Sequence, residues 1–212
     1  MAEVILIGEH TDAITLRRSL RTMLIQASNA RKIRTSPADI NKHVLLLDEP
    51  PRHVRKHLEK EGLHQGASCI VLGSEKNQCR DRALPHIERS DGAWFDFTIT
   101  VRKGKGALEL LAYDFELRLP PGMGAPFLRF DLNLPAHRNE ERELRCHLHP
   151  GSDDILVPAP LMRPAELLAL LIDGVRPTAE RKAARAPTLF EVSWFKDTLG
   201  LLSPSEAAPP AR

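Results

Sequence analysis

The first 75 residues alternate short apolar runs with stretches whose apolar residues recur at helical spacing. The apolar runs end at a glycine or at acidic residues and proline, and they predict buried strands at residues 4–7, 44–47 and 68–72. The helical stretches lie between these runs, at residues 12–33 and 52–61. The order strand, helix, strand, helix, strand is typical of parallel sheets, so we expect a small α/β unit at residues 1–75.

From Trp94 onwards the hydrophobic period changes to strict alternation. This alternation predicts four strands, at residues 94–101, 108–119, 128–134 and 144–149. Lysines and glycines at residues 103–106 form a turn that joins the first two strands into a hairpin. A proline opens a helical stretch at residues 164–172, which would cover the apolar face of the sheet. We therefore expect a four-stranded antiparallel sheet covered by a helix at residues 94–175.

The remaining segments separate or follow these two units. Residues 76–93 are polar and turn-rich and predict a linker, and all aromatic residues lie at or after Trp94. Residues 176–187 form a basic, alanine-rich connector, and residues 188–202 place apolar side chains along one helical stripe. Residues 203–212 predict a disordered tail. The expected fold class is thus α+β, with a C-terminal amphipathic helix.

Composition and charge narrow the class of protein. Hydrophobic residues make up 42% and charged residues 27%, which excludes a disordered regulator, a collagen-like fibre and a bundle of membrane helices. Because 30 Lys and Arg nearly balance 28 Asp and Glu, no overall charge draws the chain toward nucleic acid or anionic lipid. The 3 cysteines form no CxxC pair, and we find no basic leader and no long apolar run. We expect a cytoplasmic protein that does not contact a membrane.

Acidic residues near the ends of the N-terminal strands resemble part of the pocket of response-regulator receiver domains. Asp48 ends the second apolar run, where a receiver carries its phosphoacceptor, and Ser74 follows the third run. Glu9 and Asp12 follow the first run. The paired acids after the first strand and a lysine after a fifth strand are missing. The resemblance therefore implies a degenerate receiver-like or Rossmann-like unit that is not phosphorylated, and an unrelated α/β unit is the alternative.

Ionisable side chains occupy the polar side of the last two predicted strands. His147 and His149 are two residues apart, so on a strand they point to the same side, with Arg145 before them. Arg129 and Asp131 occupy the polar side of the preceding strand. If the two strands pair, imidazoles, guanidiniums and a carboxylate meet across the sheet.

Three interpretations of this surface are open. A histidine tuned by a carboxylate moves protons near neutral pH while arginines hold a phosphodiester, as metal-free RNA cleavage requires. Alternatively, the histidine pair binds a divalent metal, with His137 of the intervening loop or an aspartate as the third ligand. A solvated face on which Arg and Asp pair is the third possibility. We expect the first, with no metal and no cofactor. Its catalytic residues would be His147, His149, Asp131 and His137, and its phosphate-binding residues Arg129 and Arg145.

The same region resembles small bacterial toxins of the TumE type, found in toxin–antitoxin pairs. Their sheet carries an Arg-x-Asp strand, a histidine a few residues on, and a second strand with closely spaced histidines. The matching residues here are Arg129, Asp131, His137, His147 and His149. The resemblance covers residues 94–174, and the N-terminal unit has no counterpart in it. It implies a bacterial protein in a toxin–antitoxin or defence setting.

The C-terminal helix points to a different kind of function. Its aromatic and apolar residues include Phe190, Trp194, Phe195 and Leu199. On a basic connector, such a helix is typical of docking into the groove of a partner, and packing on its own sheet is the alternative. Our leading hypothesis is a bacterial cytoplasmic protein that binds or cleaves RNA or another phosphate-bearing ligand through the His/Arg/Asp face. The alternative is a non-catalytic adaptor or complex subunit that docks a protein partner through this helix.

Overall fold

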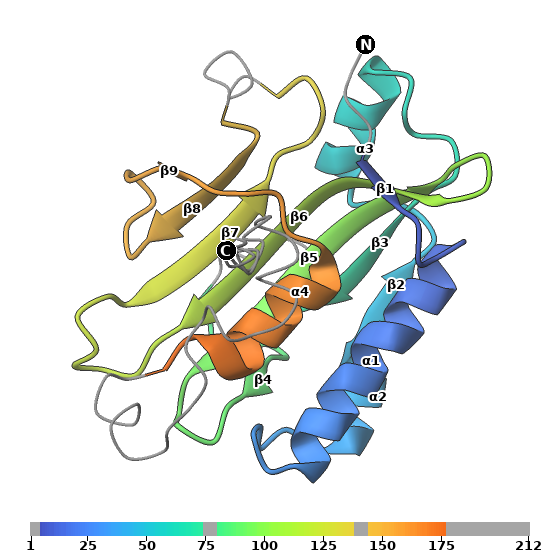
Figure 1. Cartoon of the computed structure of the whole chain (residues 1–212). Coiled ribbons are helices and arrows are strands. Elements are labelled where there is room, and N and C mark those ends of the chain that lie inside the picture. The colour runs from blue at the N-terminus through green and yellow to red at the C-terminus, as the bar shows by residue number, and fades with distance from the viewer. Residues whose placement is uncertain (1–4, 74–79, 138–143, 177–212) are drawn as a thin grey trace, which may run out of the picture. The chain divides into compact units, whose positions relative to one another are not determined.

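The computed structural model describes residues 5–73, 80–137 and 144–176 (Figure 1). The helices are α1 (Ala13–Asn29), α2 (Pro37–His43), α3 (Arg52–Lys60) and α4 (Pro164–Ala169), which continues as the π-helical turn η3 (Leu170–Gly174). The strands are β1 (Ile5–Ile7), β2 (Leu45–Leu47), β3 (Ala67–Leu72), β4 (Ile87–Glu88), β5 (Trp94–Lys103), β6 (Leu108–Arg118), β7 (Phe127–Leu132), β8 (Cys146–Pro150) and β9 (Val157–Pro158). Within these ranges, no helix is both long and apolar enough to cross a membrane.

All the strands described belong to one antiparallel sheet with the order β2-β3-β5-β6-β7-β8-β9, while β1 pairs with β6 and β4 with β5. The predicted α+β class with an antiparallel sheet is confirmed. The prediction of four strands is wrong, because the sheet has nine. The longest pairing, between β5 and β6, is the hairpin that the alternation predicted.

The N-terminal strands are not parallel, contrary to our expectation. β3 pairs antiparallel with β2 on one side and with β5 on the other, from Ala67 opposite Arg102 to Leu72 opposite Phe97. An apolar run shows that a strand is buried on both faces but does not encode its direction, so the sequence pattern suits either arrangement. The pairing of β3 with β5 also joins residues on either side of the linker predicted at 76–93.

The chain forms two compact units, Met1–Ile172 and Asp173–Arg212. Every strand among the described residues lies in the first unit. The second is described only as far as Arg176, whose guanidinium donates to the Asp173 carboxylate at 2.9 Å. The predicted connector from residue 177, the helix at 188–202 and the tail at 203–212 lie outside the described residues.

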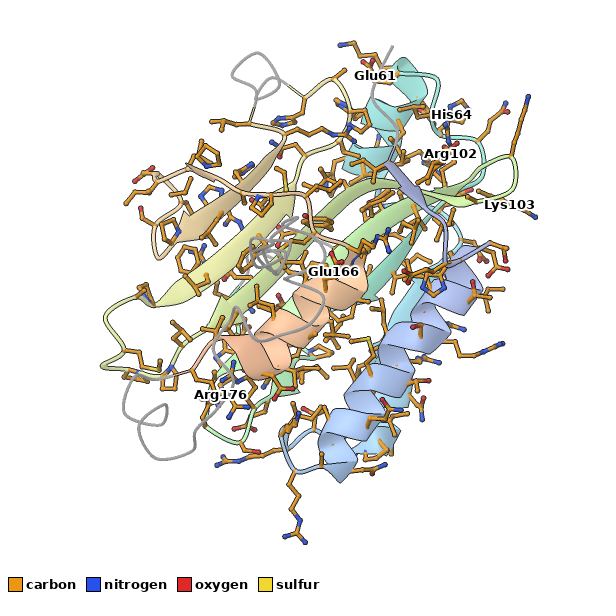
Figure 2. All side chains as sticks on the ribbon, in the orientation of Figure 1. Glu61, His64, Arg102, Lys103, Glu166 and Arg176 are labelled. Atoms are coloured by element: carbon orange, nitrogen blue, oxygen red, sulfur yellow. The ribbon has the colours of Figure 1, made fainter. Side chains whose placement is uncertain are left out.

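The helices begin at local signals in the sequence. The Asp12 carboxylate accepts a hydrogen bond from Thr15 N at 2.8 Å and so caps α1. The Ser36 hydroxyl accepts a hydrogen bond from Asp39 N at 3.2 Å and starts α2. The hydrophobic periodicity did not predict this helix, although Ser followed by Pro is a helix-start signal. Glu166, labelled in Figure 2, lies in the first turn of α4 and accepts from Arg163 N at 2.6 Å.

The sheet has one apolar side, and α1 and α4 lie along it (Figure 1). α1 contacts α4 and three strands of the sheet, and its residues Leu16, Leu20 and Leu24 are buried one turn apart. The odd-numbered residues from Phe95 to Val101 in β5 and from Leu111 to Leu117 in β6 are buried, and the rings of Phe97 and Phe115 stack with their centroids 5.1 Å apart. Because successive side chains of a strand point to opposite sides, the even-numbered residues lie on the other face.

Candidate functional site

The strands β5 to β8 place polar side chains in register on this second face of the sheet. In one row, Asp96 lies opposite Glu116, Glu116 opposite Arg129, and Arg129 opposite His149. The neighbouring row runs across the same four strands in the order Thr98, Asp114, Asp131 and His147. We call these two rows the polar face. It brings together residues that are up to 53 positions apart, from Asp96 to His149 by number.

The polar face is buried. Glu116 is 0% exposed, His147 2%, and both His149 and Arg129 4%. The expected solvation of this face is therefore wrong, whereas the pairing of Arg with Asp is present between Arg129 and Asp131. Alternation of polar and apolar residues predicts two different sides of a sheet, but it does not show whether the polar side meets water. Buried ionisable groups require partners, and these partners define the site.

Asp131 is the centre of the site, because one oxygen of its carboxylate faces three nitrogens. Asp131 Oδ2 lies 3.0 Å from Arg129 Nε, 3.2 Å from His149 Nε2 and 3.4 Å from His147 Nε2. Burial raises the pKa of Asp131, but hydrogen bonds from His147 and His149 and the charge of Arg129 outweigh it and hold the pKa below its usual range. Within the described chain, Asp131 Oδ1 is buried and has no hydrogen-bond partner.

The two histidines of the site are not equivalent. His147 Nδ1 lies 3.0 Å from the Leu144 carbonyl oxygen, which can only accept, so Nδ1 carries a hydrogen. His149 Nδ1 is buried and lacks a hydrogen-bond partner among the described residues. The rings meet edge to face, with centroids 5.0 Å apart. His147 is thus held at both ring nitrogens, whereas His149 keeps one nitrogen available.

An arginine–carboxylate network continues from Asp131 along the polar face. Glu116 accepts from Arg80 Nε at 2.8 Å and lies 3.0 Å from Arg118 Nε, and Arg118 Nη1 lies 2.9 Å from Asp96 Oδ2. Asp153 pairs with Arg129 and also accepts from Arg80 at 2.7 Å. Aromatic rings support two of the cations: Arg80 lies over Phe127 and Arg118 over Trp94, at 3.8 and 4.3 Å from the ring centroids.

The network contains more carboxylates than guanidiniums. The guanidiniums belong to Arg80, Arg118 and Arg129. The carboxylates belong to Asp96, Asp114, Glu116, Asp131 and Asp153. Three guanidiniums face five carboxyl groups among the described residues, and burial raises the pKa of one of them, Asp96, to about 7. The permanent positive charges are therefore outnumbered by the carboxyl groups.

The structure brings four of the predicted site residues together: Arg129, Asp131, His147 and His149. Arg145 lies just before β8 and donates to the carbonyl oxygens of Asn133 and Leu111, each at 3.2 Å. His137 is exposed in the loop after β7, with its ring 6.5 Å from that of His57, and it is not part of the cluster. The docking residues Phe190, Trp194, Phe195 and Leu199 lie outside the described residues.

Some residues of the site were not among the predicted site residues. The alternation of β5 and β6 already placed Asp96 and Glu116 on the polar side, so their membership follows from the same pattern. Arg80 comes from the segment predicted as a linker, and no local pattern marks it. In the N-terminal part, Asp12 caps α1 and Glu9 pairs with Arg163, while Ser74 lies outside the described residues.

Asp131, His147 and His149 can also hold a metal. Among the described residues they are the one group of His, Cys, Asp and Glu that offers three ligand atoms together, all within 4.8 Å of one another. Two imidazoles and a carboxylate suit Zn²⁺ and similar ions. We call these three residues the His/Asp cluster. Its geometry is compatible with proton transfer and with metal binding.

Comparisons with known proteins assign the chain to no family. No protein-family model matches it, and neither a curated protein nor a solved structure is significantly similar to it. The resemblance to TumE-type toxins stays a prediction, and the function is inferred from the geometry of the site.

Glu116 provides a test of the buried network. We predict that Glu116→Gln lowers the free energy of unfolding by about 3–5 kcal/mol, because it leaves buried guanidiniums without a full negative charge. Asp153→Asn is the matched control: its side chain is 52% exposed, so the expected loss is below about 1 kcal/mol. Urea denaturation of both variants measures the difference. Equal losses would show that the network does not depend on Glu116.

Asp96 makes stability depend on pH. Burial raises the pKa of Asp96 to about 7, although the charge of Arg118 opposes this. A carboxyl group with a raised pKa stabilises the fold most when it is protonated, and this contribution is lost as the pH rises toward 7. Asparagine does not titrate, so the variant keeps its stability as the pH rises. We predict that the unfolding free energy of Asp96→Asn minus that of the wild type increases by about 2.5 kcal/mol from pH 5 to pH 8. Urea denaturation at both pH values measures this gain, and a difference that does not change with pH contradicts it.

Proposed function

We propose that the protein binds and acts on a phosphate-bearing ligand at the His/Asp cluster, with RNA as the first candidate. The observation that carries the proposal is a single buried carboxylate, that of Asp131, facing the Nε2 atoms of His147 and His149. Histidine gains and loses protons nearest to neutral pH, and a carboxylate that orients it is a recurring arrangement in general acid–base catalysis.

The geometry supports different roles for the two histidines. With Nε2 donating to Asp131, the Nδ1 atom of His149 would accept a proton from an attacking hydroxyl and return it to a leaving oxygen. Because Nδ1 is buried, the proposal requires that the ligand opens this face of the sheet. In RNA the attacking group would be the ribose 2′-hydroxyl. Asp131 orients His149, as an aspartate orients the base of a catalytic triad. His147 is a positioning residue, because the Leu144 carbonyl holds its Nδ1.

The arginines expected to bind phosphate have different partners. Arg129 pairs with Asp131 and Asp153, so its role in the proposal is to hold the carboxylate of the cluster. Arg145 donates to two backbone carbonyls and secures the chain before β8. Arg129 is therefore already paired with carboxylates, and Arg145 keeps its charge but directs donors to backbone carbonyls.

RNA cleavage by the purified chain tests the proposal. Single-stranded RNA of mixed sequence is incubated with the wild type, His149→Ala and Asp131→Asn. We expect the His149 substitution to lower the cleavage rate by about 100-fold or more, since removal of a general base costs 10²–10⁴. His137→Ala is the matched control, because His137 is an exposed histidine outside the cluster, and its rate should equal that of the wild type.

Circular dichroism and thermal unfolding of each variant show whether the fold is retained, which matters because His149 is buried. A folded His149→Ala variant that cleaves as fast as the wild type contradicts the proposal, and so does a wild type that cleaves no RNA. Absence of cleavage would favour the alternative adaptor function. That function predicts loss of partner binding when residues 188–212 are deleted.

A further inference from the structure

We propose that Asp131, His147 and His149 bind a divalent transition-metal ion, with Zn²⁺ as the first candidate. The inference deepens the proposed function of the same cluster and rests on it for its biological role. The metal site itself stands on the geometry of the three side chains.

The strand register builds a metal-binding donor set from two adjacent strands. β7 supplies Asp131, and β8 supplies His147 directly opposite it and His149 two residues later, on the same face. Zinc sites with catalytic activity use three protein ligands of this kind and leave a fourth position for water or substrate. All three side chains are held on regular strands, so the ligand atoms are placed by the sheet.

The two distances from the Asp131 oxygen to the histidine nitrogens fit a metal ion. Nitrogen–oxygen hydrogen bonds are about 2.9–3.0 Å long, and lengths above about 3.2 Å are poor. Two ligand atoms that each lie about 2.0–2.1 Å from a tetrahedral metal are about 3.3 Å apart. Asp131 Oδ2 lies 3.4 Å from His147 Nε2 and 3.2 Å from His149 Nε2. The His147 distance in particular is longer than a good hydrogen bond and close to the edge of a metal tetrahedron.

The hydrogen bonding of His147 favours a cation between it and Asp131. Since Nδ1 donates to the Leu144 carbonyl, a neutral His147 ring presents the lone pair of Nε2 to a carboxylate oxygen. Two acceptors then face each other unless a proton on Nε2 or a metal ion lies between them. Donation from the second ring nitrogen to a backbone carbonyl is also the usual outer-shell arrangement of a metal-binding histidine.

Two further observations point to an additional ligand at the cluster. Asp131 Oδ1 and His149 Nδ1 are buried, and the described residues provide neither of them with a hydrogen-bond partner. The surrounding network has three guanidiniums for five carboxyl groups, so a divalent ion would balance the excess of acidic groups. Bound there, it would also offer a phosphate group a positive charge beside the histidines.

Metal binding is measured on purified full-length chain that has been treated with EDTA and dialysed. Zn²⁺ is titrated by calorimetry, and Co²⁺ is followed through its visible absorption, which reports coordination by nitrogen and oxygen ligands. The wild type should bind one ion at the cluster. Asp131→Asn, His147→Gln and His149→Gln should each weaken the affinity by about 100-fold or more, since even an outer-shell change costs 10–100-fold. His137→Ala should bind as the wild type does.

Thermal unfolding controls for variants that fail to fold. Zn²⁺ should raise the melting temperature of the wild type and of His137→Ala, and should leave that of a folded Asp131→Asn variant unchanged. The proposal is overturned if the wild type binds no Zn²⁺. It is also overturned if folded cluster variants keep the wild-type affinity, which would place the ion at other histidines of the chain.

The RNA assay with and without EDTA separates this inference from the proposed function. Cleavage that requires His149 and stops with EDTA supports the metal site and the RNA function, with His149 as a metal ligand through Nε2 and not as the proton acceptor. Zinc binding at the cluster without any cleavage supports the metal site and contradicts the RNA function. Cleavage that requires His149, persists in EDTA and occurs in a protein that binds no Zn²⁺ supports the proton-transfer function and overturns the metal site.

Discussion

The buried carboxylate of Asp131 constrains the structure around it. An ion inside a protein costs several kcal/mol unless opposite charges and hydrogen bonds compensate it. Here the compensation comes from Arg129 on the same strand and from the two histidines of β8, which reach Asp131 only in the observed register. A shift of β8 by one residue would turn both histidines to the apolar side of the sheet. The charge network and the strand pairing therefore depend on each other.

This dependence explains how the site is held. Its three central side chains stand on paired strands. Arg129 contacts Asp131 and the Leu144 carbonyl contacts His147 from outside the cluster. His149 is held by Asp131 itself. The next shell, centred on Glu116, has its own guanidinium partners and is buried as well. Asp131 Oδ1 and His149 Nδ1, two of the buried atoms without hydrogen-bond partners in the described chain, belong to the centre of the cluster. A proton or a metal ion added to the site would bind at the cluster.

Much of this could be predicted from the sequence, and the rest could not for physical reasons. Strict alternation identified β5 to β8 and placed Asp131, His147 and His149 on one polar side, because the side-chain period of a strand is two. The same pattern cannot tell a solvated face from a buried one. Nor does an apolar run such as β3 encode its partner, so its pairing with β5 was missed. Arg145 and His137 lie beyond the strand ends, where alternation no longer determines direction.

The state of the imidazole rings is the most direct measure of whether Asp131 organises this face. Long-range proton–nitrogen correlation spectra of metal-free protein distinguish protonated from unprotonated ring nitrogens. The structure predicts a protonated Nδ1 in His147, since that atom faces a carbonyl oxygen. It also predicts that Asp131→Asn changes the ring nitrogen signals of both His147 and His149 and leaves those of His137 as they are. An unprotonated Nδ1 in His147, or ring signals that ignore the Asp131 substitution, would contradict the account.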